Sequence, residues 1–175
     1  MDAGTQVPVL ETARLRLRAH RPDDHAACTA LWADPEVVRH IGGRPFTAEE
    51  TWRRMLASRG LWSMLGFGYW AVEEKAGGRY VGDVGFGDFR REIEPSLAGM
   101  LECGWVLSPQ VHGRGYASEA VAAATAWADA HLPGMRAVCL IEEGNAASIR
   151  VAGKAGFREW RRTTYHGGAA LIFAH

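Results

Sequence analysis

The stretch from Leu101 to Ala130 constrains the fold more than any other, because it joins a short apolar segment to an alanine-rich segment through a glycine loop. Residues 101–107 are apolar and are followed by a Ser-Pro pair, which is typical of a buried β-strand. From residue 117 the apolar side chains recur at intervals of three and four, which predicts an amphipathic helix. A helix that begins directly after a glycine loop offers free backbone amides and the positive end of its dipole. We therefore expect this loop to bind a phosphate or pyrophosphate group.

Two familiar nucleotide-binding loops do not match the stretch Gly113-Arg114-Gly115. A Walker loop requires lysine followed by serine or threonine after its last glycine, and Tyr116-Ala117 stand there. A dinucleotide fingerprint requires three spaced glycines, and Ala117 breaks that spacing. The loop therefore needs a third explanation.

The length and composition indicate one globular domain over residues 1–175. Twenty basic and twenty acidic side chains cancel, so we expect neither a nucleic-acid partner nor an acidic membrane surface. Without an apolar run of about 20 residues or a signal-peptide pattern, the expected location is the cytoplasm. Cys28, Cys103 and Cys139 lack paired spacing, which indicates reduced core thiols and neither a disulfide nor a metal site.

The rest of the chain alternates between strand and helix patterns. Residues 13–19 alternate strictly, which predicts a half-buried strand whose three arginines form a solvated face. A capping box, Thr47 to Glu50, predicts the start of a helix, and Asn145 is expected to cap another. Gly77-Gly78 predicts a hairpin turn. The expected order is strand, two helices, three strands, helix, strand, helix and one or two strands, hence a mixed α/β sheet flanked by helices.

Two runs are specific enough to carry a resemblance: HGRGYASEA at residues 112–120 and NAASIRVAGKAGF at residues 145–157. With LECGWVLSP and YVGDVGF in the expected order, they make the chain similar to the GNAT superfamily of acyl-CoA-dependent N-acetyltransferases. Within that superfamily it most resembles the RimJ/RimL branch, the ribosomal-protein N-terminal acetyltransferases. The resemblance covers about residues 10–160. It implies the GNAT-like acyl-CoA N-acyltransferase fold, with a mostly antiparallel central sheet, and acetyl-CoA as donor.

The resemblance assigns the glycine loop to coenzyme A. The superfamily pattern Arg/Gln-x-x-Gly-x-Gly/Ala falls on His112, Gly115 and Ala117, so a histidine replaces the usual basic or amide residue. Arg114 either adds a charge-assisted phosphate contact or is a solvated loop arginine. The amides expected to hold the pyrophosphate are those of Gly113, Arg114, Gly115, Tyr116, Ala117 and Ser118.

The resemblance also assigns the pantetheine arm, which is expected to pair with the backbone of Trp105 and Leu107 like an added strand. The Trp105 N–H would then be the donor to the thioester oxyanion. Asn145 is expected near the pantetheine as well as at the helix cap, and Ser148 near the sulfur.

Acyl transfer from a thioester needs a donor to the leaving thiolate and a proton acceptor for the amine. Many superfamily members use a tyrosine at the position of Ala152; in the resembling branch a serine one turn earlier takes that role, which falls on Ser148. Glu102 is the best candidate base, because a carboxylate in an apolar strand must be paired or functional. A salt bridge from Glu102 to an arginine, with water as the base, is the open alternative. The weaker base candidates are Glu142, Glu143 and His166.

The acceptor is the least constrained part of this prediction. An α-amine at a protein or peptide N-terminus is preferred, because it is partly neutral at pH 7 and needs no strongly perturbed base. The alternatives are a small-molecule amine such as a polyamine or an antibiotic, and a non-catalytic acyl-CoA-binding sensor. Trp52, Trp62 and Trp70 are candidates for acceptor-pocket walls or for core. A homodimer stays open.

Overall fold

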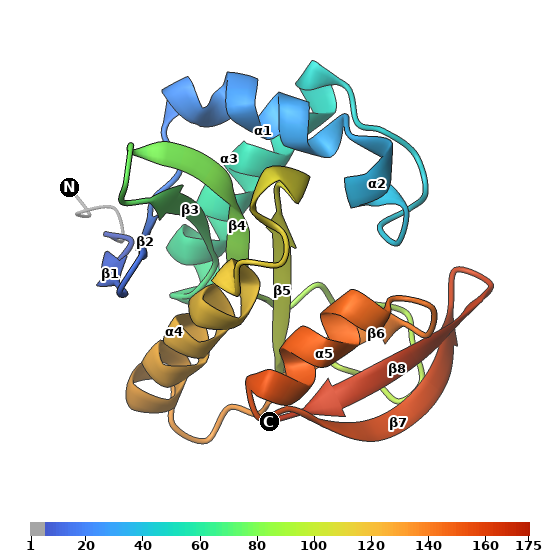
Figure 1. Cartoon of the computed structure of the whole chain (residues 1–175). Coiled ribbons are helices and arrows are strands. Elements are labelled where there is room, and N and C mark those ends of the chain that lie inside the picture. Colours follow the sequence, from blue (N-terminus) through green and yellow to red (C-terminus); the bar gives the residue numbers. More distant parts are fainter. Residues whose placement is uncertain (1–5) are drawn as a thin grey trace.

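The computed structural model describes residues 6–175 as a mixed α/β fold, and the first five residues of the predicted domain lie outside the described part (Figure 1). The strands are β1 (Leu10–Glu11), β2 (Leu15–Arg18), β3 (Tyr69–Glu74), β4 (Arg79–Gly87), β5 (Leu101–Leu107), β6 (Ala137–Glu142), β7 (Arg158–Tyr165) and β8 (Gly168–Ala174). The helices are α1 (His25–Trp32), α2 (Pro35–Val38), α3 (Ala48–Leu65), α4 (Tyr116–His131) and α5 (Ala146–Lys154), with short 3₁₀ turns η1 (Pro22–Asp24) and η2 (Pro109–Val111).

The strands form one sheet in the order β1-β2-β3-β4-β5-β6-β8-β7. Its neighbouring strands are antiparallel with one exception, the parallel pair β5 and β6 at the centre. That pair is short: only Leu101↔Ala137 and Glu102↔Val138 are in register. Beyond residues 102 and 138 the two strands separate, so the sheet contains a V-shaped gap.

Helices cover both faces of the sheet (Figure 1). On one face, α1 and α2 bury Leu31, Trp32 and Val38, and partly buried Val106 of β5 packs against them. On the other face, α4 buries an alanine-rich stripe against the sheet, as the three-and-four spacing predicts, and α4 also contacts α5. The gap between β5 and β6 therefore connects two separately covered faces.

The predicted local signals are present where the sequence placed them. The Thr47 hydroxyl and Glu50 carboxylate form a capping box at the start of α3. Asn145 caps α5, and Gly77-Gly78 connects β3 to β4. Among residues 6–175, the model has no helix whose length and apolarity would let it span a membrane.

The prediction of a fully solvated arginine face on β2 is wrong for Arg18. Arg18 is only 4% exposed, and its guanidinium binds both carboxylate oxygens of Asp24 at 2.8 Å and Glu73 Oε2 at 2.6 Å. The chain turns from β2 into η1 directly after this strand. This turn brings the Asp24 carboxylate over the arginine, and Glu73 reaches it from the neighbouring strand β3, so the charge is paired where it is buried.

The core contains the cysteines and two of the three candidate tryptophans. Cys28, Cys103 and Cys139 are buried free thiols, as expected. Trp62 and Trp70 are buried and pack edge-to-face with each other, so they belong to the core and not to a pocket wall. The third candidate, Trp52, is 37% exposed on α3.

Candidate active site

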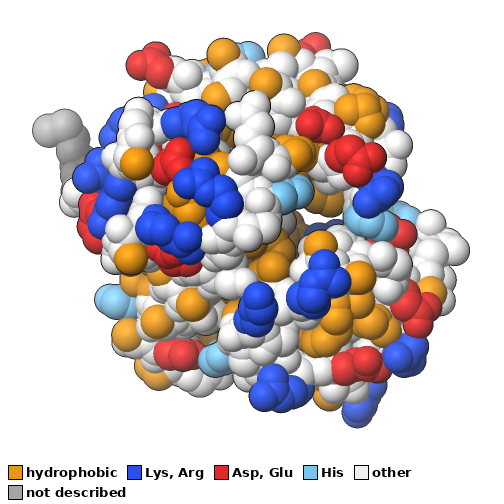
Figure 2. All heavy atoms as spheres, in the orientation of Figure 1, with side chains coloured by type: hydrophobic (Ala, Val, Ile, Leu, Met, Phe, Trp, Pro, Cys, Tyr) orange, Lys and Arg blue, Asp and Glu red, His pale blue; other side chains and the backbone are white. Residues whose placement is uncertain are grey.

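A cavity of about 740 Å³ lies where the sheet opens, between the start of α4, the start of α5 and the end of α2. Figure 2 shows the hollow in this face, with hydrophobic side chains inside it and blue Lys and Arg side chains on both sides. Its lining includes Arg39, Arg150 and Lys154. The cavity is therefore apolar in depth and basic at its rim.

Every second backbone amide of β5 points into the gap. The Leu101 N–H donates to Arg136 O at 2.9 Å on the β6 side, whereas the Ser108 N–H donates to Val81 O at 2.8 Å on the β4 side. Because N–H direction alternates along a strand, the amides of residues 103, 105 and 107 point toward β6. Beyond the apex no β6 residue is in register with them, so the Trp105 backbone and the Leu107 amide face the gap and can pair with an extended ligand.

The glycine loop places a helix N-terminus at one end of this gap. Gly113 and Gly115 have φ of 74° and 78°, a left-handed conformation that glycine adopts without strain. The first bond within α4 runs from Glu119 N to Gly115 O at 3.1 Å. The amides of Tyr116, Ala117 and Ser118 therefore lack an acceptor within the helix and form an anion site. All three residues line the cavity, with the two glycines.

Side chains from β2 and β3 hold this loop in place. The Tyr116 hydroxyl donates to Glu74 at 2.5 Å, and Arg114 Nη2 lies 3.0 Å from the same carboxylate oxygen. Arg14 donates to the Arg114 carbonyl at 2.8 Å and pairs with Glu119 at 2.7 Å. The Tyr116 hydrogen bond holds the pKa of Glu74 below its usual range. Arg114 is thus held by an ion pair, which neither of its two predicted roles included.

The His112 side chain contacts the backbone at the C-terminal end of β5. Its Nε2 lies 2.9 Å from Leu107 O, a carbonyl on the gap side of the strand. This contact occupies the carbonyl and leaves the Leu107 amide facing the gap. A histidine thus holds the strand end where the family pattern has arginine or glutamine.

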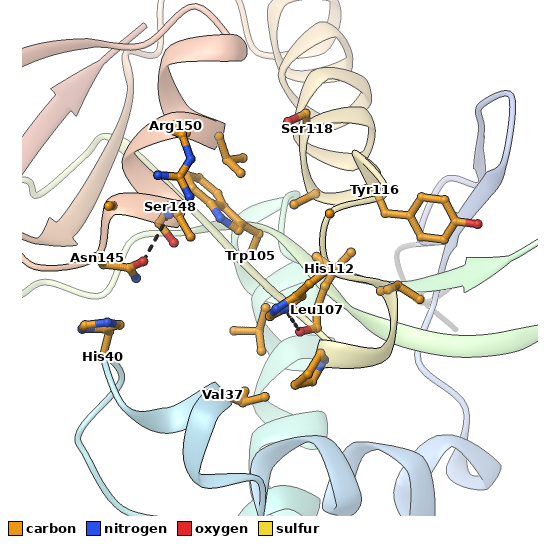
Figure 3. Close-up of a pocket in the computed structure, with 18 of the residues that line it drawn as sticks. Val37, His40, Trp105, Leu107, His112, Tyr116, Ser118, Asn145, Ser148 and Arg150 are labelled. Carbon is orange, nitrogen blue, oxygen red and sulfur yellow. Dashed lines mark hydrogen bonds between the residues drawn. The ribbon is translucent and has the colours of Figure 1, made fainter.

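The N-terminus of α5 forms the opposite side of the cavity. Asn145 Oδ1 accepts from Ser148 N at 3.1 Å, so the cap prediction is confirmed. Figure 3 draws Asn145, Ser148 and Trp105 around one cavity, and all three line it. The site thus brings together two helix N-termini, a row of strand amides and one serine hydroxyl. Such a set can bind a phosphate-bearing extended ligand and donate to a leaving group.

Glu102 lies at the apex of the gap but does not line this cavity. Arg91 binds both of its carboxylate oxygens, with Nε at 2.9 and 2.8 Å and Nη2 at 2.7 Å. Arg91 Nη1 also donates to the Tyr165 hydroxyl at 2.7 Å. The salt bridge, the open alternative of the sequence analysis, is therefore formed. Burial acts to lower the pKa of Arg91, but its hydrogen bonds and charge pairing with Glu102 raise it overall.

Sequence reasoning did not single out His40, which lines the cavity from the end of α2. Its Nδ1 lies 3.2 Å from Glu142 Oε1 at the end of β6. The other weak base candidates lie elsewhere: Glu143 pairs with Arg162 at 2.6 Å, and His166 lines a second cavity of about 320 Å³ with Glu92, Thr164 and Tyr165. The signal that could have identified His40 is its position two residues after Val38, the buried last residue of α2. That signal is weak without the fold.

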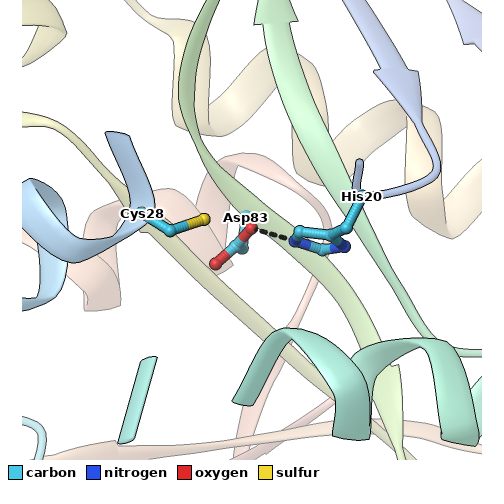
Figure 4. Close-up of side chains that lie close together, drawn as sticks. All are labelled: His20, Cys28 and Asp83. Atoms are coloured by element: carbon cyan, nitrogen blue, oxygen red, sulfur yellow. Dashed lines mark hydrogen bonds and ion pairs between the residues drawn. The ribbon is translucent and has the colours of Figure 1, made fainter. Parts of the chain in front are cut away.

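Three side chains of types that can ligate a metal lie together inside the fold, and none of them lines the cavity. His20, Cys28 and Asp83 are buried with their ligand atoms within 4.8 Å of one another (Figure 4). Asp83 Oδ1 is already bound by His20 Nε2 at 2.6 Å and by the Tyr80 hydroxyl at 2.9 Å. Burial raises the pKa of the Cys28 thiol to about 12. The carboxylate is thus satisfied by side chains, and the thiol is held protonated.

Comparison with known proteins identifies the family. The chain is 29% identical over 171 residues to the uncharacterized protein YkkB of Bacillus subtilis (strain 168), covering 93% of this chain and 94% of that one. The structure of a GnaT-family acetyltransferase from Bordetella pertussis superposes with a TM-score of 0.84 at 28% identity, over 97% and 99% of the two chains. RimL, a ribosomal L7/L12 α-N-protein acetyltransferase solved with coenzyme A, shares the fold (TM-score 0.76, 19% identity, 96% and 97% coverage).

The family model for the acetyltransferase (GNAT) domain matches residues 14–158, which include both sides of the cavity. The eight-stranded, mostly antiparallel sheet flanked by helices confirms the predicted fold class. Acetyltransferases of this family take their acetyl group from acetyl-CoA. The chain belongs to the GNAT family of acetyltransferases.

Proposed function

We propose that this protein transfers the acetyl group of acetyl-CoA directly to a primary amine, and that the acceptor is the α-amine at a protein or peptide N-terminus. The proposal places the chain with the RimJ/RimL branch of the family. The three buried free thiols suit a reducing compartment, which supports the cytoplasm as its location.

The observation that carries the proposal is the row of strand amides that faces a gap beside two helix N-termini. Only two residue pairs join β5 to β6, and the free edge lies between the α4 and α5 starts. Coenzyme A combines a pyrophosphate with a long amide-bearing arm. A helix N-terminus suits the pyrophosphate, and an unpaired strand edge suits the arm.

The residues take distinct parts in the proposed transfer. The amides from Gly113 to Ser118 hold the pyrophosphate, and the backbone of Trp105 and Leu107 orients the arm. The Trp105 N–H donates to the carbonyl oxygen as negative charge develops on it. The Ser148 hydroxyl donates to the leaving thiolate, which is a fair leaving group because a thiol has a pKa near ~8.5.

The preference for an α-amine rests on the proton that the acceptor must lose before it attacks. Arg91 binds the Glu102 carboxylate on both oxygens, and Glu102 does not line the cavity. An acceptor with a sizeable neutral fraction at pH 7 therefore suits this site better than one that is almost fully protonated.

The test is an acetyl-CoA turnover assay with a panel of amines: peptides with a free N-terminus, N-blocked lysine peptides, polyamines and aminoglycosides. Thiol release with a free-N-terminus peptide, together with a mass gain of one acetyl group, is the expected result. Faster turnover of a polyamine or aminoglycoside would move the acceptor to small molecules. Tight acetyl-CoA binding without turnover of any amine would make the protein an acyl-CoA sensor.

A further inference from the structure

His40 reaches the cavity from the face opposite α4 and α5, together with its neighbours Val37, Arg39 and Ile41. It lines the cavity together with Asn145 and Ser148, but it comes from the end of α2 and they come from α5 (Figure 3). Its side chain is 21% exposed, so it is partly withdrawn from solvent and still open to the cavity.

A carboxylate lies beside the His40 ring. Nδ1 lies 3.2 Å from Glu142 Oε1, an ion-pair distance without hydrogen-bond geometry. A neutral imidazole keeps a lone pair on one ring nitrogen, with which it can accept a proton.

The position of Glu142 relative to the gap supports the same role. The last pair at the apex is Glu102↔Val138, so three residues further along each strand, Trp105 and Ile141 stand across the gap from each other. Glu142 is the next residue, and its backbone carbonyl accepts from the Asn145 amide at 2.9 Å. Glu142 therefore lies at the level of the gap where the reacting carbonyl is expected.

The groups for the two proton transfers, from the amine and to the thiolate, lie on opposite faces of the sheet. Ser148 lies on α5, whereas His40 lies with α2 on the side packed against Val106. A proton has to leave the amine on one side of the carbonyl and reach the thiolate on the other. With Ser148 as proton donor on one side of the gap and His40 as proton acceptor on the other, the site meets that requirement.

We propose that His40, which lies beside Glu142, is the general base of this acetyltransferase; the assignment rests on the proposed function. A ring nitrogen of His40 removes one proton from the acceptor ammonium, directly or through one water, and passes it to solvent. The neutral amine attacks the thioester carbon, the carbon–sulfur bond breaks, and the second amine proton leaves with the coenzyme A thiol by way of Ser148.

Charged and titratable groups surround His40 from several elements. Glu142 faces it from β6, and Glu36 and Arg39 share its segment and pair with each other at 3.7 Å. Arg150 and Lys154 of α5 line the same cavity, as does His112 after η2. Glu102 is bound by Arg91 and does not line the cavity. A base at His40 and a base at Glu102 therefore predict a rate loss in different variants.

The experiment measures kcat/KM for a free-N-terminus peptide between pH 6 and 9 in His40→Gln, Glu142→Gln and Glu102→Gln. We expect His40→Gln to lose about 10²-fold at pH 7. Glu142→Gln should lose about 10-fold, because it removes the negative charge beside the His40 ring. Both losses should shrink as the pH rises, because the amine then loses its proton without help. Acetyl-CoA affinity by calorimetry should stay unchanged, which also checks folding.

His131→Gln is the matched control, because His131 stacks on Trp127 at the far end of α4. Added imidazole should restore part of the rate that His40→Ala loses, and it should leave the rate of His131→Ala unchanged. A His40→Gln enzyme with the wild-type rate, or a loss that is equal at pH 6 and pH 9, would overturn the assignment. A pH-dependent loss confined to Glu102→Gln would give the role to Glu102. If the wild type acetylates no amine, the proposed function fails and this assignment fails with it.

Discussion

Ser148 contributes a backbone amide to the helix cap, and in the proposed transfer its hydroxyl has a second, separable role. Its amide completes the Asn145 cap at 3.1 Å, and its side chain faces the cavity that Trp105 also lines. We expect Ser148→Ala to lower kcat about 10²-fold, because the leaving thiolate loses its donor, with little change in acetyl-CoA affinity. Steady-state kinetics and calorimetry measure the two quantities.

The control for this prediction is Ser148→Thr, which keeps the hydroxyl and the backbone cap. It should retain far more activity than Ser148→Ala. Wild-type turnover in Ser148→Ala would assign proton donation to another group or to water.

At the scale of single residues, the sequence predicts what is local and misses what is distant. The Asn145 cap was predictable, because the capping side chain and the amide that donates to it are three residues apart. The contact between His40 and Glu142 joins residues more than a hundred positions apart, so no spacing rule could identify it. The partner of Glu102 was predictable only as a type, since Arg91 reaches it from the irregular segment between β4 and β5.

At the scale of elements, the junction between β2 and α1 depends on a buried ion pair. Asp24 accepts from Arg18 on both oxygens at 2.8 Å and from the Arg21 amide at 2.7 Å. Asp24→Asn should lower the free energy of unfolding at pH 7 by about 3 kcal/mol, at the low end for breaking a buried pair because Glu73 still binds Arg18. Urea unfolding measures the difference.

Acid should remove the same contribution in the wild type. Burial acts to raise the pKa of Asp24, but the hydrogen bonds from Arg18 and Arg21 outweigh burial and hold it below its usual range. A lowered folded-state pKa adds stability above the unfolded value near ~3.9, and this stability is lost as the pH falls through the folded value. The gap between wild type and Asp24→Asn should therefore narrow below about pH 4. An equal gap at pH 7 and pH 3 would contradict this account.

The glycine loop is the second element whose geometry can be tested. A Cβ at Gly115 would lie 3.4 Å from Arg14 Nη2, so the fold leaves room for a small side chain at this position. Gly115→Asp places a carboxylate beside the free amides of α4, where it should repel phosphate and block its approach. We expect loss of measurable coenzyme A binding by calorimetry while the circular dichroism spectrum stays native.

Gly78→Asp is the matched control, since Gly78 also has a positive φ, of 65°, and lies in the hairpin between β3 and β4. Both variants introduce the same backbone strain, about 1 kcal/mol or slightly more. Only Gly115→Asp should lose coenzyme A. Unchanged affinity in a folded Gly115→Asp protein would contradict the assignment of the loop.

Most elements were predictable because their signals are short-range. The order of helices and strands follows the expected one, with β1 and α2 as additions. These two were missed because β1 has two residues and α2 has four, too short for a periodic pattern. The depth of Arg18 was missed because alternation describes which side a residue faces, and burial depends on what covers that side.

At the scale of the whole molecule, the decisive feature is the parallel pair β5 and β6 in an otherwise antiparallel sheet. Their separation beyond residues 102 and 138 opens a passage between a face with two helix N-termini and a face with the end of α2. A donor from one side and an acceptor from the other can therefore meet at Trp105. No local pattern predicts this passage, because it depends on how far two strands stay paired.

The proposed acceptor preference concerns the whole passage, and it is testable with two peptides. An α-amine with a pKa near ~8 is about 10% neutral at pH 7, whereas a lysine amine near ~10.4 is less than ~0.1% neutral. Because only the neutral amine attacks, a peptide with a free N-terminus and no lysine should react about two orders of magnitude faster than its N-blocked counterpart with one internal lysine. The rates at pH 7, measured as thiol release at saturating acetyl-CoA, give this ratio. The ratio should fall as the pH rises toward the lysine pKa, since the neutral fractions then converge. Equal rates at pH 7 would show that the site deprotonates lysine itself, and this account of the acceptor would then be wrong.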